Sequence, residues 1–242
     1  MHPYIHLYGK VIPSYGLCAV SGFVAALIVI KALSRSRRLN VEDGIYIFTL
    51  GALGAVAGAK LLYVILSLPQ IISDLPLLKA DAGLFFTKYI SGGLVLYGGI
   101  AGGIAAAYYT AKGYGDSLTE YSAVLLPAMA VMQSLGRVGC FMAGCCYGRN
   151  GIPVQLIEAG FDIMLAVFFA VKGKNCAFRR CAAARYVIYY ASFRFVIEFF
   201  RGDAIRGHIG VLSTSQWISI VAIIASAFVI MHVKVRNNVR ED

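Results

Sequence analysis

The segment from Gly136 to Gly148, GRVGCFMAGCCYG, combines one arginine with three cysteines in a single stretch. Cys140, Cys145 and Cys146 follow a C-x4-C-C pattern, which is compatible with a metal site, a disulfide or plain packing of small side chains. Structural zinc normally has four ligands, arranged as two closely spaced pairs, and no histidine or second pair lies near these cysteines. We therefore expect no bound metal. Packing is the first interpretation, and a disulfide from Cys140 to Cys145 or Cys146 is the second.

Three charged side chains interrupt the apolar segment YYASFRFVIEFFRGD, at Arg194, Glu198 and Arg201. Glu198 follows Arg194 by four residues, so both side chains share one face of a helix. An arginine inside a membrane helix is costly and normally faces the bundle interior with a partner. The stripe is therefore either a structural ion pair or an anion site, in which Arg194 binds a ligand and Glu198 orients it or accepts a proton.

Other polar side chains lie at the ends of apolar segments. Arg137 ends one of them and is a candidate second arm of the same anion clamp, because a guanidinium donates two parallel hydrogen bonds. Gln155 and Glu158 share one helix face in GIPVQLIEAGFD and are expected to line the same cavity. Tyr15, at the start of the first apolar segment, is interpreted as an interfacial anchor or as a headgroup contact.

Glycines dominate the segment SGGLVLYGGIAGG, from Ser91 to Gly103. Helices approach closely where side chains are missing, so tight packing explains these glycines, and close approach of a lipid is the alternative. Tyr97 stands among them with a phenol that can donate to a phosphate or ester oxygen. A nucleotide-binding loop is disfavoured, because no strand precedes the glycines and the segment is apolar.

The elements that position these residues follow from composition. The chain has 242 residues, of which 59% are hydrophobic and 14% charged, whereas soluble domains are about half apolar and a quarter charged. This composition indicates an integral membrane protein. The net charge of +10 comes from short basic clusters between apolar segments, which is typical of loops facing anionic lipid. The expected partner is the bilayer, and no nucleic acid is expected.

We expect an all-α fold forming a single transmembrane domain over residues 1–242. No internal repeat is evident, and no signal peptide with a charged start and an apolar core is evident before the first segment. Each apolar segment is near the roughly 20 residues that a bilayer requires. About seven transmembrane helices are predicted, at residues 12–33, 44–67, 90–111, 119–136, 154–172, 183–200 and 214–233.

Orientation is predicted from lysine and arginine, which favour cytoplasmic loops. Basic residues gather after the first segment, between the fifth and sixth, and after the seventh, so these three regions share one side. The N-terminus is then outside and the C-terminus cytoplasmic. The loops expected at 68–89, 137–153 and 201–213 face outward.

Six fragments in order resemble the prolipoprotein diacylglyceryl transferase family, and together they span most of the chain. The fragment from Gly136 to Gly148 resembles the family signature, which begins Gly-Arg-x-Gly and ends with an aromatic residue and glycine. The others are SYGL, GGLVLYGGIAGG, PVQLIEA, FRFVIEFFRGD and LSTSQWISI.

The resemblance implies a bacterial plasma membrane enzyme that moves the diacylglyceryl group of phosphatidylglycerol onto the lipobox cysteine of a preprolipoprotein. A thioether forms and glycerol phosphate leaves, without a cofactor or metal. By resemblance, Tyr15, Arg137, Gly148, Arg194 and Glu198 match family positions linked to binding or catalysis. The catalytic residues that we expect are Arg137, Arg194, Glu198 and Tyr97. The substrate-binding residues that we expect are Tyr15, Arg137, Gly98, Gly99, Cys140, Gly148, Gln155 and Arg201.

The sequence departs from the family pattern at two places. Tyr97 stands where many members have histidine, and a phenol with a reference pKa near 10 is a poor base. Cys140 and Cys145 stand where the signature often has Asn and Glu. These departures leave open a paralogous transferase with another acceptor. A small transporter and a membrane thiol–disulfide protein are the alternatives from other classes, although the C-x-x-C spacing of the latter is absent.

Overall fold

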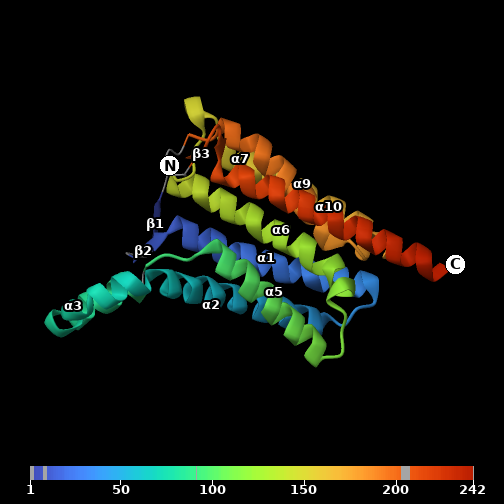
Figure 1. The fold of residues 1–242 in the computed structure, drawn as a ribbon, viewed down its shortest axis with the longest axis horizontal. Helices are drawn as coiled ribbons and strands as arrows, with labels where there is room; N and C mark the ends of the chain where they lie inside the picture. Colours follow the sequence, from blue (N-terminus) through green and yellow to red (C-terminus); the bar gives the residue numbers. More distant parts are fainter. Residues whose placement is uncertain (1–2, 8–9, 91, 203–207, 242) are drawn as a thin grey trace. The chain divides into compact units, whose positions relative to one another are not determined.

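The computed structural model describes residues 3–7, 10–90, 92–202 and 208–241, and within them the chain is almost entirely helical (Figure 1). The chain forms two compact units. Residues 1–39 and 119–242 form the first unit, and residues 40–118 form the second.

Five helices in the described part of the chain are long and apolar enough to cross a membrane, which confirms an all-α fold with membrane-spanning helices. They are Ser14–Arg37 (α1), Val41–Ser73 (α2), Leu118–Ala143 (α6), Val154–Lys172 (α7) and the Thr214–Lys234 part of α10. The other two expected spans correspond to Leu96–Gly113 (α5) and Ala182–Ile197 (α9), which have 18 and 16 residues. The count of seven and the orientation stay predictions.

The first unit also contains short elements around its long helices. A hairpin precedes α1, and a smaller one leads into α10, which runs from Thr214 to Glu241. The short elements are β1 (Tyr4–Leu7), β2 (Lys10–Pro13), η1 (Arg149–Gly151), α8 (Cys176–Arg179), η2 (Glu198–Phe200), β3 (His208–Ile209) and β4 (Leu212–Ser213).

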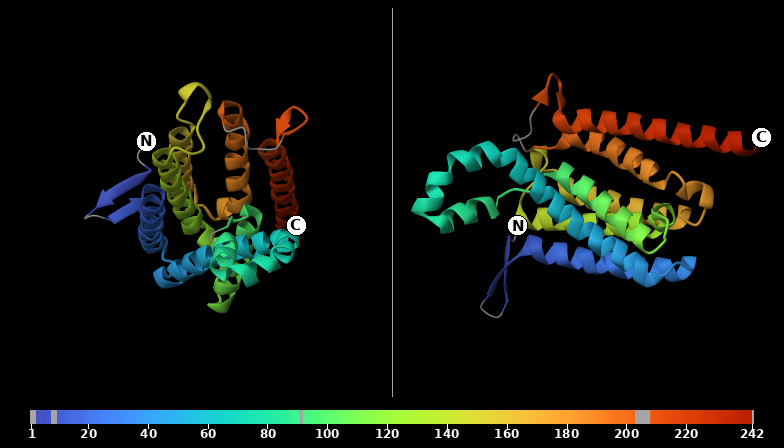
Figure 2. Two further views of the ribbon diagram at one scale, coloured as in Figure 1. Left: turned by 90° about the vertical axis from the view of Figure 1, so that its left-hand side faces the viewer. Right: turned by 60° about the horizontal axis from the view of Figure 1, so that its bottom comes forward.

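Helices α1 and α6 lie side by side in the first unit (Figures 1 and 2), because glycines remove side chains where the two meet. A Cβ atom at Gly22 would lie 3.0 Å from the backbone oxygen of Met132. A Cβ atom at Gly139 would lie 3.0 Å from Cys18 and 3.2 Å from the Tyr15 ring. The second contact brings the start of α1 to the end of α6, where the signature segment begins.

Aromatic side chains join α7 to α9. The rings of Phe161 and Phe193 stack with centroids 3.8 Å apart, and Phe169 meets Tyr186 at 5.4 Å. Ala130 of α6 belongs to the same buried cluster. This packing fixes the two helices that carry Glu158 and Arg194.

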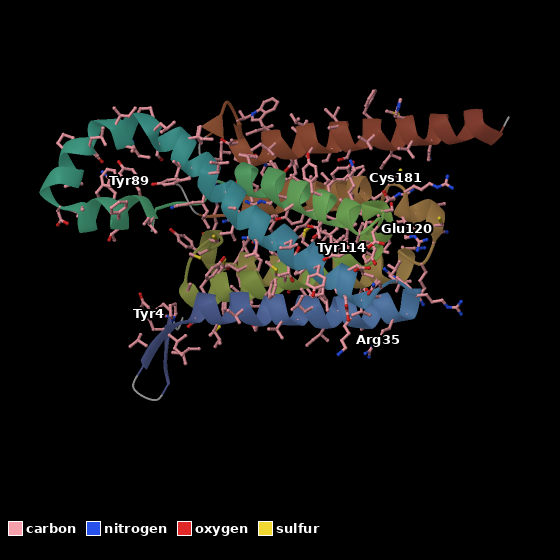
Figure 3. All side chains as sticks on the ribbon, turned by 90° about the horizontal axis from the view of Figure 1, so that it is seen from below. Tyr4, Arg35, Tyr89, Tyr114, Glu120 and Cys181 are labelled. Atoms are coloured by element: carbon pink, nitrogen blue, oxygen red, sulfur yellow. The ribbon has the colours of Figure 1, made fainter. Side chains whose placement is uncertain are left out.

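The two ends of the first unit differ in charge. Tyr4 lies at one end of α1, and Arg35, Glu120 and Cys181 gather at the opposite end of the unit (Figure 3). At that basic end the Arg37 guanidinium donates to the backbone oxygens of Ala123 and Ala170, tying α1 to α6 and α7. The signature segment lies at the other end of the unit, where Gly139 of α6 meets Tyr15 at the start of α1.

In the second unit, one prediction from the sequence was wrong, namely the loop at residues 68–89. The segment 68–89, expected as a loop, is helical: α2 continues to Ser73, and α3 (Leu75–Ala80) and α4 (Ala82–Ile90) follow. Lys88 and Tyr89 of α4 both donate to Asp74, at 2.5 and 2.6 Å. This pairing folds α4 back on the end of α2, and Lys60 of α2 donates to the backbone oxygens of Tyr89, Ile90 and Gly92.

Small residues allow α2 and α5 to pack with their backbones in near contact. A Cβ atom at Gly58 would lie 2.3 Å from the Gly98 backbone oxygen, and one at Gly102 would lie 2.3 Å from that of Gly54. Spacing by four residues on both helices places these glycines on facing stripes, as in membrane helix pairs. The glycine-rich segment is therefore a helix-packing surface.

Candidate functional site

Five charged residues from three segments converge in the first unit, and all but Arg137 are buried. Arg137 lies near the end of α6, Glu158 near the start of α7 and Arg194 near the end of α9. Glu198 begins η2, and Arg201 follows it. Four of the five side chains are less than 10% exposed, and Arg137 is 18% exposed.

Glu158 is the centre of this cluster. Its Oε1 atom lies 2.7 Å from Arg194 Nη1 and 3.4 Å from Arg201 Nη1, and its Oε2 atom lies 3.2 Å from Arg137 Nη1. One carboxylate therefore contacts three guanidinium groups. This arrangement orients all three arginines toward a common point.

Glu198 is the second carboxylate of the cluster, and it connects α9 to α10. Its Oε2 atom accepts from Arg194 Nη2 at 2.6 Å, and its Oε1 atom accepts from the Ser213 hydroxyl at 3.0 Å. Ser213 and Gln216 also cap the start of α10 reciprocally, since each backbone N–H donates to the other side chain. The cap holds the hydroxyl against Glu198.

Three guanidinium groups face two carboxylates in this cluster, so the cluster carries one positive charge in excess when the neighbouring carboxyl of Asp162 is neutral. Burial weakens solvent screening, so an excess charge here attracts an anion more strongly than it would in water. Guanidinium groups also match the geometry of phosphate oxygens. The cluster is suited to holding a phosphate group at the end of the helices.

The loop after α6 turns back over the helix end. Gly144 has a φ of +75°, and the Cys145 N–H donates to the Cys140 carbonyl at 3.1 Å, which closes the helix. Gln155, buried near the start of α7, donates from Nε2 to the Cys145 carbonyl at 2.7 Å. Gln155 therefore holds this loop, and its role in substrate binding stays a prediction.

Gly148 positions Arg201 through the backbone. The two residues form an isolated antiparallel bridge, and the Arg149 Nε atom donates to the Arg201 carbonyl at 2.9 Å. A Cβ atom at Gly148 would lie 2.4 Å from the Ile152 carbonyl oxygen and 2.5 Å from Val154. Only glycine fits at this position without a shift of backbone atoms.

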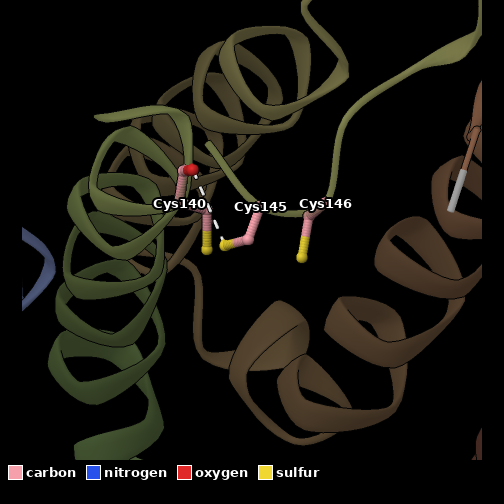
Figure 4. A group of neighbouring side chains, drawn as sticks. All are labelled: Cys140, Cys145 and Cys146. Carbon is pink, nitrogen blue, oxygen red and sulfur yellow. Dashed lines mark hydrogen bonds between the residues drawn. The ribbon is translucent and has the colours of Figure 1, made fainter. Parts of the chain in front are cut away.

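The three cysteines of the signature segment come together at the same end. Their Sγ atoms lie within 4.8 Å of one another, and the Cys145 thiol points to the Cys140 carbonyl (Figure 4). All three thiols are free. A hydrogen bond from Cys140, together with the nearby Arg201 guanidinium, lowers the pKa of the Cys146 thiol well below its usual range.

The remaining expected site residues divide between the two units. Tyr15 is half exposed and packs against Gly139. Tyr97, Gly98 and Gly99 belong to the second unit, where Gly98 and Gly99 face α2 and the Tyr97 side chain is exposed. Their part in substrate binding or catalysis stays a prediction. Asp203, at the end of FRFVIEFFRGD, lies outside the described residues.

Sequence reasoning did not identify the full set of partners. Glu158 was expected to line the cavity, but its contacts with three arginines were not anticipated. Asp162, four residues after Glu158 on α7, is also buried and accepts from Gln133 at 3.3 Å. Two carboxylates inside one apolar segment were the available signal, because such residues normally face a partner within the bundle.

The fold defines a protein with membrane-spanning helices, and at one end of the helices of its first unit three arginines meet two glutamates. The sequence profile of the family described as "Prolipoprotein diacylglyceryl transferase" matches residues 3–232. The chain therefore belongs to the prolipoprotein diacylglyceryl transferase family.

Named relatives agree with this assignment. The chain is 33% identical to the phosphatidylglycerol–prolipoprotein diacylglyceryl transferase of Clostridium tetani (strain Massachusetts / E88), over 92% of this chain and 94% of the relative. It is 30% identical to the phosphatidylglycerol–prolipoprotein diacylglyceryl transferase 2 of Clostridium perfringens (strain 13 / Type A), over 90% of each chain. The transferase of Leptospira interrogans serovar Lai (strain 56601) is 24% identical over 78% of this chain and 71% of its own length.

Proposed function

We propose that the protein transfers the diacylglyceryl group of phosphatidylglycerol to the lipobox cysteine thiol of prolipoproteins, forming a thioether and releasing glycerol phosphate. Family membership and the names of the relatives support this activity. The structural observation that carries it is the buried cluster of Arg137, Arg194 and Arg201 around two carboxylates. The reaction requires such a cationic site, because it starts from an anionic phosphodiester and releases a more highly charged phosphate.

Arg137 is proposed to make the first contact with the phosphodiester. Its side chain is the most exposed of the three arginines, at 18% against 9% for Arg194 and 3% for Arg201. Its 3.2 Å contact with Glu158 is also longer than the 2.7 Å contact of Arg194. A phosphate oxygen can therefore replace Glu158 at Arg137 while Arg194 stays paired.

The proposed transfer is a displacement at the glyceryl carbon that bears the phosphate. The thiol sulfur forms the C–S bond, the C–O bond breaks, and its electron pair passes to the phosphate oxygen of the leaving glycerol phosphate. Arginines held by Glu158 and Glu198 stabilise this charge without reorganising. The thiol proton is assigned to Glu198, whose Oε1 atom accepts from the neutral Ser213 hydroxyl while Oε2 pairs with Arg194.

The other predicted residues have supporting roles in this proposal. Cys140, Gly148 and Gln155 form the lip of the headgroup pocket, and Tyr15 contacts lipid beside it. Tyr97 is proposed to donate a hydrogen bond to a substrate oxygen, and Gly98 and Gly99 are proposed to support it by holding α5 against α2.

We place the protein in the bacterial plasma membrane, with the cluster near the outer face. In the first unit, the basic residues after α1 and between α7 and α9 lie at the end opposite the cluster. Because lysine and arginine favour the cytoplasmic side, the cluster end would face outward, where a secreted prolipoprotein presents its cysteine.

The direct test is mass spectrometry of a synthetic lipobox peptide incubated with the purified protein and phosphatidylglycerol. The expected product is the peptide with one diacylglyceryl group on its cysteine, with equimolar release of glycerol phosphate. A peptide that stays unmodified, while the folded protein consumes the lipid, would assign a different acceptor. Flux of an anion through proteoliposomes without any lipid product would favour a transporter.

A further inference from the structure

The three thiols at the end of α6 form a site that the proposed transfer does not use as reactive groups. Cys140 lies in the last turn of α6, and Cys145 and Cys146 lie in the loop that follows. Cys145 is exposed, and the other two are partly buried. A small ion can therefore reach them from one side, and Figure 4 shows the three sulfur atoms along that side of the loop.

We propose that these thiols bind one soft d10 metal cation, Cu(I) or Zn(II), through three sulfur ligands. The Sγ atoms already lie within 4.8 Å of one another. Metal–sulfur bonds of about 2.3 Å place sulfur atoms about 4 Å apart around one ion. A shift of less than about 1 Å in each distance completes the site, whereas a disulfide requires sulfurs about 2 Å apart.

The backbone holds the sulfurs in this arrangement without the ion. Cys146 has a φ of +58°, which is uncommon for a residue other than glycine. The loop that contains it is fixed to α6 by the Cys145 N–H bond to the Cys140 carbonyl and to α7 by Gln155. The sequence spacing argued against zinc because a fourth ligand is missing. Three protein ligands are nevertheless sufficient when water or no fourth group completes the coordination.

The surrounding charge favours the complex. Three thiolates around a divalent cation carry one net negative charge, and around a monovalent cation they carry two. The Arg201 guanidinium lies beside Cys146, and Arg137 lies near Cys140. Thiolate ligands select soft ions over magnesium or calcium, and binding releases the thiol protons to solvent. The ion would tie the end of α6 to the loop that leads to Gly148 and Arg201.

The test uses the full-length protein, reduced with a phosphine, desalted without oxygen and titrated with Cd(II) as a spectroscopic substitute. Saturation of the thiolate-to-cadmium absorption at one equivalent is expected, together with a rise in melting temperature, since an ion bound only by the folded protein stabilises it. Cys145→Ser is expected to weaken Cd(II) binding by at least about 100-fold. Losing a residue that only supports a metal ligand costs up to about 100-fold in affinity, so the loss of a direct ligand should cost at least as much. Cys176→Ser, at the exposed cysteine of α8, is the matched control and should bind as the wild type does.

The titration also decides against the proposal in clear ways. Equal Cd(II) affinity in the wild type and in Cys145→Ser would overturn it. Loss of the absorption in Cys176→Ser would move the site elsewhere. A disulfide among Cys140, Cys145 and Cys146 that re-forms in air and resists competition by Cd(II) or Zn(II) would replace the metal site with a redox pair. If a variant does not fold, the wild-type titration still tests the proposal, because a wild-type protein that does not saturate at one equivalent of Cd(II) would contradict it.

Discussion

Glu158 on α7 and Arg194 on α9 form a 2.7 Å ion pair in which both side chains are buried. The same carboxylate contacts Arg137 and Arg201, so its removal takes one ion pair from each of the three arginines. Removing one partner of a buried ion pair costs about 3–5 kcal/mol, because the remaining charge loses its compensation. Glu158 is therefore expected to maintain both the stability of the first unit and the orientation of the arginines.

Replacing Glu158 with Gln is predicted to lower the melting temperature and to reduce transfer by about 100-fold or more. The measurement is thermal unfolding in detergent together with transfer to a lipobox peptide. Gln133→Ala removes a hydrogen bond to Asp162, which lies on the same helix as Glu158, and leaves the ion pairs of Glu158 in place, so it is the matched control. A Glu158→Gln protein with wild-type activity would remove Glu158 from the account.

Glu198→Gln tests the assigned proton acceptor. The amide keeps the size of the side chain and can still accept from Ser213, but it does not take a proton. Loss of a general base typically reduces rate by about 10²–10⁴-fold, so kcat should fall while the KM for phosphatidylglycerol changes little. An unchanged kcat, or a loss confined to KM, would assign Glu198 to positioning of Arg194.

Gly148→Ala is predicted to destabilise the first unit by about 1–3 kcal/mol, as overpacking does elsewhere. The added Cβ atom would meet the Ile152 carbonyl oxygen at 2.4 Å, and the bridge to Arg201 would shift. Gly160→Ala is the control, because a Cβ atom there meets nothing within 4 Å and alanine favours a helix. Thermal unfolding of both variants measures the difference, and a Gly148→Ala protein as stable as Gly160→Ala would contradict the close packing.

Asp74 is expected to make the pairing of α4 with the end of α2, in the second unit, depend on pH. Hydrogen bonds from Lys88 and then Tyr89 lower the pKa of the Asp74 carboxyl below its reference value of 3.8. A carboxyl whose pKa is lower in the folded state than in the unfolded state stabilises the folded state. This stabilisation is complete above the pKa of the unfolded state and is lost as pH falls through the pKa of the folded state. The pairing of α4 with the end of α2 should therefore weaken only below about pH 4.

Amide hydrogen exchange over residues 82–90, corrected for the intrinsic effect of pH, measures that opening. We expect about two- to fivefold faster opening at low pH, since exposed ion pairs contribute little. Asp74→Asn should remove the pH dependence. Equal protection of the wild type on both sides of pH 4 would contradict the pairing.

Much of the fold was predictable because long apolar segments leave few alternatives to membrane helices. The segment 68–89 was misjudged, since the contacts of Asp74 with Lys88 and Tyr89 join residues that sequence reasoning treats separately. For the site, the i,i+4 spacing indicated the pair of Arg194 and Glu198. The position of Glu158 depends on how α6, α7 and α9 pack, and no local spacing encodes that.

The proximity of the three cysteine sulfurs also could not be predicted from their spacing in the sequence. Their linear pattern lacks the second ligand pair of a typical zinc site, yet Gly144 and Cys146, both with positive φ, bring the three sulfurs together. For Gly98 and Gly99 the motif left two interpretations open, packing of helices and close approach of a lipid. In the structure the Cα atoms of both glycines face α2.

The most direct test of the central claim is single-turnover transfer of the diacylglyceryl group by Arg137→Ala, compared with Arg35→Ala. Arg137 contacts the cluster and is its most exposed arginine, whereas Arg35 lies at the other end of the first unit (Figure 3). Arg137→Ala is predicted to lose about 100-fold or more of the transfer rate, and Arg137→Lys is predicted to recover only part of it because lysine lacks the planar fork. Arg35→Ala should retain wild-type transfer. Full transfer by a folded Arg137→Ala protein would contradict the assignment of the cluster as the phosphate site.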